Sequence, residues 1–303
     1  MLISIVTINY NNATGLQATV QSVLAQTYPH IEYIVVDGAS TDGSVAYLQS
    51  LPTSTNFRFI SEPDGGIYNA QNKGAKMATG EYVHILNSGD TMASPTAIEH
   101  WVHALGTQRP QLVGANVGYV YGKKIVEKTC PKTLYPGYFF THVLYHPAVM
   151  VQKAVHEQYG YYDEQYRIAA DWGFHFKLAC LGVSYAYVPV MLAHFDTTGV
   201  SSTHEQTAKQ TAERQKIVQS LIPQASAGEL SNFHEAIAYQ GISYPDFEKR
   251  LLVWRNSRSK VRTAMRNGHK FKAVWYTLFL PMPMALRKLL LKQQLFAAAY
   301  KVG

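Results

Sequence analysis

The first 90 residues alternate short β-branched runs with helical patterns, and this order constrains the fold more than any other feature of the chain. Residues 3–8 and 31–36 are apolar runs typical of buried strands. The segment between them carries apolar residues at helical spacing, namely Leu16, Val20, Val23 and Leu24. Two such strands joined by a helix form a βαβ unit with parallel strands. We therefore expect an α/β protein with a mostly parallel central sheet flanked by helices.

The alternation continues beyond the first unit. We expect a turn at 37–43, a short helix at 45–48, a strand at 57–60, a helix at 67–78 and a strand at 82–86. The middle of the chain mixes strands with a helix that opens at Asp171, and from about residue 205 the pattern is helical. The strands expected in the middle are 112–121, 148–151 and 185–192.

Polar side chains follow three of the expected strands, at residues 9–11, 37–38 and 87–90. In an open parallel sheet, ligands bind beyond the carboxyl ends of the strands, so these groups should meet at one edge. A nucleotide would suit such an edge. The sequence contains neither GxGxxG after the first strand nor GxxxxGK[ST], which disfavours a dinucleotide oxidoreductase and a P-loop enzyme.

Cysteine content and charge distribution restrict the class of protein and its expected location. The only two cysteines, Cys130 and Cys180, form no CxxC pair, so a zinc ribbon or a disulfide scaffold is not supported and a cytoplasmic location is expected. The net charge of +7 is concentrated at one end, because residues 249–303 carry 13 basic and no acidic side chains. One end of the chain is therefore polycationic.

Five segments in a fixed order resemble the inverting glycosyltransferases of family 2, of the type found in bacterial polysaccharide biosynthesis. These segments are SIVTINYN at 4–11, SVLAQTY at 22–28, VVDGASTDG at 35–43, EPDGGIYNAQNKG at 62–74 and LNSGD at 86–90. The resemblance implies a GT-A fold with a catalytic domain at 1–204, divided into a nucleotide-binding half at about 1–90 and an acceptor half at 91–204. A helical, basic, membrane-associating region at 205–303 would follow.

The segment at 86–90 resembles the Asp-x-Asp metal motif of that family, but Asn87 and Gly89 stand where carboxylates are usual. Asp90 is therefore the predicted ligand of Mg²⁺ or Mn²⁺, with water and donor phosphate oxygens completing the coordination. Asn87 and Ser88 are predicted donor contacts. His194 is a candidate second metal ligand, because such folds close a C-terminal loop over the diphosphate.

Further donor contacts follow from the resemblance. Asp37 is similar to the carboxylate that reads the pyrimidine imide, although an Asp-Gly pair also suits a plain turn. Thr7 and Asn9 are predicted to line the base and ribose pocket, with a simple strand-end role as the alternative. Asp64 and Asn72 are predicted donor contacts, as is Lys73, for which a solvated surface cation is the alternative.

Asp171 is the predicted catalytic base. An inverting transfer needs a carboxylate that removes a proton from the acceptor hydroxyl, and the segment 168–178 resembles the family motif that carries it. The alternative is a helix N-cap, a position that Asp often occupies. Trp172 and His146 are predicted acceptor contacts, with a core aromatic and a structural histidine as their alternatives.

The polycationic tail predicts attachment to an anionic membrane surface through residues 249–292. The apolar run at 273–286 is 14 residues long and is broken by two prolines, whereas a spanning helix needs about 20 residues. Basic side chains near an anionic leaflet contribute about 1 kcal/mol each. Nucleic acid is disfavoured, because the aromatic residues follow the charge cluster instead of interleaving with it. A helical cap on the core is the alternative for residues 289–296.

Together these features predict a cytoplasmic enzyme, peripheral on the inner face of the cell membrane. It would transfer a sugar from a nucleotide-sugar donor, expected to be UDP-linked, to a hydroxyl of a lipid-linked or polysaccharide acceptor. Two alternatives remain at this point. One is a non-catalytic nucleotide or glycan binder with an eroded metal motif, and the other is a sugar-phosphate nucleotidyltransferase.

Overall fold

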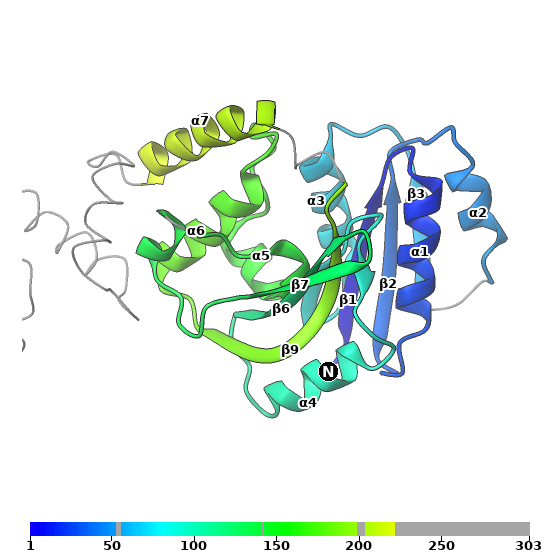
Figure 1. Cartoon of the computed structure of the whole chain (residues 1–303), viewed down its shortest axis with the longest axis horizontal. Coiled ribbons are helices and arrows are strands. Elements are labelled where there is room, and N and C mark those ends of the chain that lie inside the picture. The colour runs from blue at the N-terminus through cyan, green and yellow to red at the C-terminus, as the bar shows by residue number, and fades with distance from the viewer. Residues whose placement is uncertain (53–55, 141, 199–203, 222–303) are drawn as a thin grey trace, which may run out of the picture.

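The computed structural model describes residues 1–52, 56–140, 142–198 and 204–221, in which nine strands form one sheet surrounded by helices (Figure 1). The strands are β1 (Ile3–Asn9), β2 (Ile31–Asp37), β3 (Phe57–Ser61), β4 (Tyr82–Ile85), β5 (Thr91–Met92), β6 (Leu112–Tyr121), β7 (Lys124–Thr129), β8 (Val149–Gln152) and β9 (Tyr185–Asp196). The helices are α1 (Ala13–Leu24), α2 (Ser44–Ser50), α3 (Ile67–Met77), α4 (Ala97–Leu105), α5 (Lys153–Tyr159), α6 (Ala170–Leu181) and α7 (His204–Leu221), with 3₁₀ turns η1 (Pro136–Phe140) and η2 (His146–Ala148).

The strand order is β3-β2-β1-β4-β8-β6-β9-β5, with β7 paired to β6. The first four strands are parallel, as the alternating pattern predicts, while β8 is antiparallel to both of its neighbours. The chain runs outward from β1 to β3 and then returns to add β4 on the other side of β1. This reversal makes the carboxyl ends of β1 and β4 a topological switch point, where α/β sheets bind ligands.

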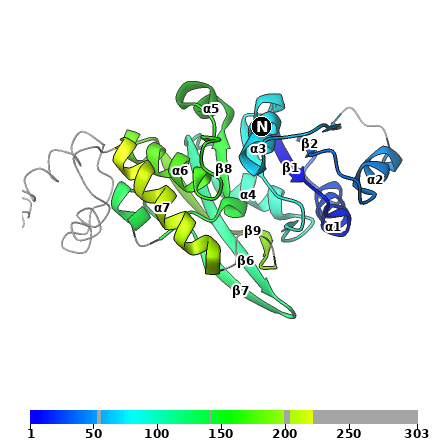
Figure 2. The ribbon, with the colours of Figure 1, turned by 90° about the horizontal axis from the view of Figure 1, so that it is seen from above.

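Helices α1 and α3 lie on opposite sides of β1 (Figure 2), and α3 packs directly on β1 and β2. Gly74 permits this close approach. A Cβ at Gly74 would lie 2.2 Å from Cγ1 of Val6 and 3.3 Å from Cγ2 of Val36. The sheet therefore tolerates no side chain at this point of α3.

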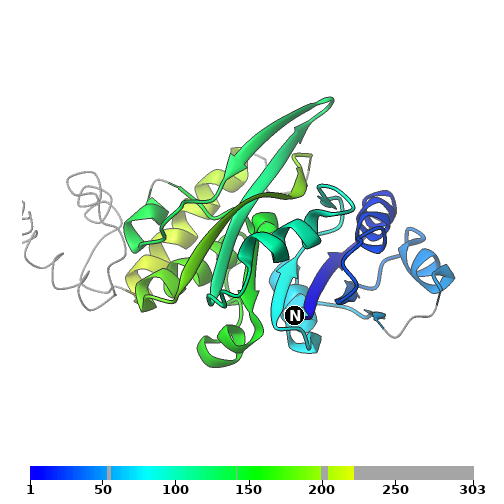
Figure 3. The same cartoon turned by 90° about the horizontal axis from the view of Figure 1, so that it is seen from below.

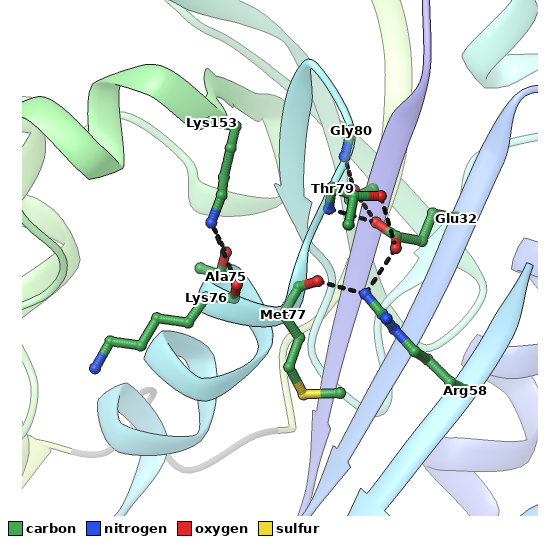
Figure 4. Close-up of polar contacts among 9 residues, drawn as sticks. Glu32, Arg58, Ala75, Lys76, Met77, Thr79, Gly80 and Lys153 are labelled. Carbon is green, nitrogen blue, oxygen red and sulfur yellow. Dashed lines mark hydrogen bonds and ion pairs between the residues drawn. The ribbon is translucent and has the colours of Figure 1, made fainter.

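Polar contacts fasten the C-terminal end of α3 (Figure 4). Arg58 on β3 donates a hydrogen bond to the carbonyl oxygen of Met77 and forms an ion pair with Glu32 at 2.7 Å. From the other side, Nζ of Lys153 donates to the carbonyl oxygen of Ala75 at 2.8 Å. A cation near the last carbonyl groups of a helix is favourable, because these oxygens have no partner within the helix.

The second half of the sheet contains a long β6–β7 hairpin, which projects from the body (Figures 2 and 3). Strand β6 matches the expected 112–121 strand, whereas β9 extends four residues beyond the expected end at residue 192. The extension allows β9 to pair with the two-residue strand β5, with His194 opposite Thr91. The end of β9 thereby reaches the loop that follows β4.

Helix α7 runs along α6 (Figure 2) and contacts it. The packed body therefore continues past residue 204, where the sequence predicts a separate region to begin, and extends at least to Leu221. The predicted membrane segment at 249–292 lies outside the described residues. Among the helices described, none is long and apolar enough to cross a membrane.

Three histidines are buried in the core, namely His84, His156 and His175, each at most 1% exposed. Burial lowers the pKa of His84 and His175 to about 4 and that of His156 to about 3. All three are therefore neutral in the folded protein at physiological pH.

We expect Gly74→Ala to lower the free energy of unfolding by about 1–3 kcal/mol, because the added methyl group would overpack the contact with Val6. This overpacking penalty should exceed the stabilisation of about 1 kcal/mol that alanine, relative to glycine, brings to a helix interior. Urea unfolding measures the difference. Gly65→Ala, where the new Cβ meets only ordinary contacts, is the matched control. An unchanged or increased stability of Gly74→Ala would contradict the close packing.

We expect stability to fall as the pH drops from about 6.5 toward about 4, since the unfolded chain binds protons at these histidines while the folded chain does not. His156→Phe should weaken this dependence, because the ring stacks on Tyr161 and Phe174 and the replacement keeps the packing. Urea unfolding at about pH 7 and about pH 5 is the measurement. The control is the exposed His103→Gln, and an equal pH dependence in all three proteins would contradict the prediction.

Candidate active site

The carboxyl ends of β1 and β2 meet at Asn9 and Asp37, which are paired across the two strands. Nδ2 of Asn9 donates to Oδ1 of Asp37 at 2.8 Å, and Ser40 and Ser61 donate to the same carboxylate. Burial raises the pKa of Asp37, but the hydrogen bonds from Ser40, Asn9 and Ser61 outweigh it and hold the pKa below its usual value. Asp37 is fully buried, so in this structure its carboxylate organises the turn at 38–42.

Asp64 is the more accessible carboxylate at this end of the sheet. Its Oδ1 accepts a hydrogen bond from the backbone N–H of Gly66 at 2.8 Å, and its side chain is half-buried. Oδ2 lies against Gly38, where a Cβ would be only 2.7 Å away. Asp64 therefore lies beside the turn that Asp37 holds. Thr7 is buried within β1, and its hydroxyl accepts a hydrogen bond from Tyr33 at 3.1 Å.

Asn72 and Lys73 are engaged in contacts within the protein. The Asn72 amide bonds both backbone groups of Tyr162 and the carboxylate of Glu164, at 2.8 to 3.0 Å, and is 3% exposed. These bonds tie α3 to the segment before α6. Nζ of Lys73 forms an ion pair with Glu62 at 2.7 Å. The Asn72 amide is thus already bonded within the protein, and its predicted contact with the donor stays a prediction.

The loop after β4 places Asn87, Ser88 and Asp90 at the switch point. Nδ2 of Asn87 lies 3.2 Å from Nε2 of His146, and Oγ of Ser88 accepts a hydrogen bond from Asn12 at 2.9 Å. Oδ1 of Asp90 accepts the backbone N–H of Asp196 at 2.9 Å. The extended end of β9 therefore orients Asp90.

Oδ2 of Asp90 is buried and has no hydrogen bond partner among the residues that the structure describes. Nε2 of His146 lies 3.5 Å from this oxygen. A buried carboxylate oxygen without a partner suits a divalent cation, which prefers hard oxygen ligands. Within the described ranges no cluster of three or more His, Cys, Asp or Glu side chains could hold a metal alone. A cation here would need phosphate and water oxygens besides Asp90.

His194 lies on the far side of the same loop. It lines a cavity of about 330 Å³ together with Gly89, Thr91, Val120, Ile125 and Asp196. Burial lowers the pKa of His194, so its imidazole is neutral near pH 7. In this arrangement His146 is the imidazole that adjoins the Asp90 carboxylate. The sequence reasoning missed Asp196, because its contact with Asp90 depends on how far β9 extends.

Asp171 lies in the first turn of α6, and Ala169 occupies the N-cap position, so the alternative role of Asp171 as the N-cap is wrong. The hydroxyl of Tyr68, on α3, donates a hydrogen bond to Oδ1 of Asp171 at 2.9 Å. Burial, followed by the neighbouring Asp171, raises the pKa of Tyr68 well above its usual value. Tyr68 therefore stays protonated and remains a donor. Tyr68 lies within the segment 62–74, but no local sequence pattern predicts its contact with Asp171.

The backbone that leads into α6 is held by α7. The Glu213 carboxylate accepts hydrogen bonds from the backbone N–H groups of Arg167, Ile168 and Ala169, all at 2.9 Å. No local sequence pattern predicts this contact, because more than 40 residues separate its partners. Glu213 thus fixes the segment immediately before Asp171.

Trp172 and His146 differ in their surroundings. Trp172 is 5% exposed and packs against Phe139 and Phe176, which places it in the core that supports Asp171. Such burial leaves little of its ring for a sugar. His146 is partly exposed and lies beside Asp90, the predicted metal ligand, and its predicted acceptor role stays a prediction.

Asp90 and Asp171 act on one common neighbour, Tyr119 of β6. Burial raises the pKa of Tyr119, and nearby tyrosines followed by Asp90 and Asp171 raise it further. Both carboxylates therefore lie within electrostatic reach of the same phenol.

Comparison of the sequence with known proteins identifies the family of this chain. The glycosyl transferase family 2 profile matches residues 4–171, and the chain belongs to this family. An uncharacterized glycosyltransferase of Mycobacterium tuberculosis is 36% identical over 211 residues, covering 68% of this chain and 79% of that protein. A PGL/p-HBAD biosynthesis glycosyltransferase of the same species is 27% identical over 213 residues, covering 67% and 80%.

Solved structures share the fold. S. aureus TarS 1–349 in complex with UDP-GlcNAc superposes with a TM-score of 0.63 at 15% identity, covering 91% of this chain and 90% of that chain. The mannosyltransferase PcManGT from Pyrobaculum calidifontis, in complex with GDP-Man and Mn²⁺, gives 0.57 at 16% identity, covering 91% and 83%. The protein is a glycosyltransferase with a GT-A fold, which confirms the predicted fold class and enzyme class.

We expect Asp90→Asn to weaken UDP binding in the presence of Mn²⁺ by at least about tenfold, because the substitution removes the carboxylate charge that faces the cation. The same variant should bind UDP equally with Mn²⁺ and with EDTA. Isothermal titration calorimetry measures both effects. The exposed Asp163→Asn serves as control. A Mn²⁺ dependence that survives in Asp90→Asn would exclude Asp90 as the ligand.

Proposed function

We propose that this enzyme transfers a sugar, with inversion, from a UDP-linked donor to a hydroxyl of a lipid-linked or polysaccharide acceptor. The proposal is supported by two acids, each with one oxygen held in a defined hydrogen bond: Asp90, whose other oxygen is buried without a partner, and Asp171, held by Tyr68. An inverting displacement needs these two functions on opposite sides of one anomeric carbon.

The base and ribose of the donor bind at the ends of β1 and β2. Asp64 accepts the imide N–H of the pyrimidine, because its side chain is half-buried and adjoins Gly38. Asp37, whose oxygens already accept four hydrogen bonds, holds the turn on which the base lies. Asn9 and Ser88 border the ribose and diphosphate.

The diphosphate lies over the loop at 87–90. A Mg²⁺ or Mn²⁺ ion, when bound, would be held by Asp90 and would neutralise the departing diphosphate. His146 lies 3.5 Å from the same carboxylate and offers a second polar group at this end of the site. The cavity beside Gly89 and Asp196 has room for one sugar ring.

Asp171 removes the acceptor proton. Tyr68 occupies Oδ1, so Oδ2 is the oxygen that accepts the proton as the acceptor hydroxyl attacks the anomeric carbon. The bond between that carbon and the donor phosphate oxygen breaks, and its electron pair leaves with the diphosphate. Attack from the face opposite the leaving group inverts the configuration. Tyr68 acts through Asp171 and is a positioning residue.

The UDP-linked donor of this proposal is supported by TarS, a fold neighbour in complex with UDP-GlcNAc. PcManGT, a fold neighbour in complex with GDP-Man, makes a GDP-linked donor the alternative. The lipid-linked or polysaccharide acceptor and the cytoplasmic, membrane-peripheral location rest on the basic segment at 249–292. The relatives named above are glycosyltransferases, so they lend no support to a nucleotidyltransferase or a non-catalytic binder.

We expect Asp171→Asn to lower sugar transfer by at least about 100-fold while UDP binding is preserved, because general-base catalysis contributes this much or more. A screen of UDP-, GDP- and dTDP-sugars for nucleotide release identifies the donor first. Transfer that persists in Asp171→Asn would exclude Asp171 as the base.

Tyr68→Phe should lower kcat several-fold without changing the donor Kd, and should have no further effect in the Asp171→Asn background. This double-mutant cycle separates positioning from a general loss of stability, which would add in both backgrounds and would lower the unfolding temperature. Additive effects on kcat would contradict the positioning role of Tyr68.

A further inference from the structure

Arg214 is a cation beside the proposed catalytic base that none of the preceding roles explains. It projects from α7, which runs along α6 (Figure 2), and its guanidinium carbon lies 5.1 Å from the centroid of the Trp172 ring. Trp172 directly follows Asp171 in the sequence. The guanidinium therefore contacts the residue that follows the proposed base.

The Arg214 side chain lacks an acidic partner within the described part of the chain. No carboxylate there lies within ion-pair distance of it, and its Nε is buried without a hydrogen bond. Burial lowers the pKa of Arg214, whereas Asp171 and then Tyr68 raise it, and a guanidinium stays charged at neutral pH. A partly buried charge without a partner is costly, so a ligand that supplies the partner would be favoured.

The position of Arg214 is set by its neighbours. Glu213, the preceding residue, accepts hydrogen bonds from three backbone N–H groups before α6. The guanidinium lies over the Trp172 ring. Stacking on an aromatic ring orients a guanidinium while leaving its N–H donors available. The site therefore presents a preorganised cation next to Asp171.

We propose that Arg214 binds an anionic group of the acceptor, a phosphate or a carboxylate that lies close to the attacking hydroxyl. The proposal rests on the proposed function, in which Asp171 receives the proton of that hydroxyl. The planar guanidinium matches the oxygens of phosphate and carboxylate in a two-point contact. The donor diphosphate is assigned to the opposite end of the site, at Asp90, so the Arg214 anion belongs to the acceptor. Arg214 thereby selects anionic acceptors over neutral glycans.

The test measures binding to the full-length protein saturated with UDP and Mn²⁺, so that the donor position is occupied. Three probes are compared by isothermal titration calorimetry: glycerol 1-phosphate, glucuronate and neutral glucose. We expect one anionic probe to bind wild type, and Arg214→Gln to weaken that binding by at least about tenfold. Arg214→Lys should retain part of the affinity. Lys216→Gln, which removes an exposed charge from the same helix, should bind like wild type.

The two anionic probes distinguish the sources of the charge, since the first represents a phosphate-bearing acceptor and the second a uronic acid. The proposal is overturned if neither anion binds wild type, if glucose binds as tightly, or if Arg214→Gln leaves the Kd of the anion unchanged. It is also overturned if Arg214→Gln weakens UDP instead, because the cation would then serve the donor.

A fallback variant and the choice of a binding assay keep the outcome interpretable. If Arg214→Gln does not fold, as judged by thermal unfolding, Arg214→Met keeps the apolar contact with Trp172 and replaces it in the comparison. Probe binding needs no turnover, so it reports on Arg214 even if Asp171→Asn retains sugar transfer. The failure of the base assignment and the failure of the anion site are therefore separable.

Discussion

Parallel pairing of β1 with β2 and β4 is the constraint on which the site depends. Parallel strands must end at the same edge of a sheet, so the register that pairs Asn9 with Asp37 also brings the loop after β4 to the same edge. The reversal of strand order at β1 makes this edge the topological switch point of the sheet. Antiparallel β8 then extends the sheet beyond β4.

The carboxylates of Asp37, Asp90 and Asp171 differ in how many hydrogen bonds they accept. Asp37 is buried and its oxygens already accept four bonds, which stabilises the ionised form and leaves it a structural part of the loop. Asp90 and Asp171 each have one oxygen held by a donor, from Asp196 and Tyr68 respectively. The second oxygen of each takes no part in these bonds. A charged group with one fixed oxygen is oriented without being neutralised.

Two helices distant in sequence build the surroundings of Asp171. The C-terminal end of α3 is held by Arg58 of β3, Asn72 ties α3 to the loop before α6, and the same helix brings Tyr68 to Asp171. α7 holds the start of α6 through Glu213 and presents Arg214 beside it. The start of α6 therefore depends on a helix that lies beyond the region matched by the family profile.

Local patterns in the sequence were enough to predict the strands of the first half, because a buried parallel strand is a run of β-branched residues between turn signals. Strand β6 was likewise predicted, while the β5 strand and the end of β9 were not, since pairing across a sheet and not local pattern decides them. Of the candidate site, Asp64, Asp90 and Asp171 were predicted from their motifs and strand ends. The same reasoning suggested Asp171 as an N-cap, which backbone geometry assigns to Ala169.

The sequence by itself determined the α/β class and the edge of the sheet where polar groups gather, because periodicity and strand direction are local properties. Only the tertiary structure decided that Tyr68 bonds Asp171, 103 residues away, and that Glu213 of α7 holds the start of α6. Such contacts cannot be predicted from the periodicity of the sequence, since each depends on the packing of whole helices. The same packing decides how many hydrogen bonds each acid accepts.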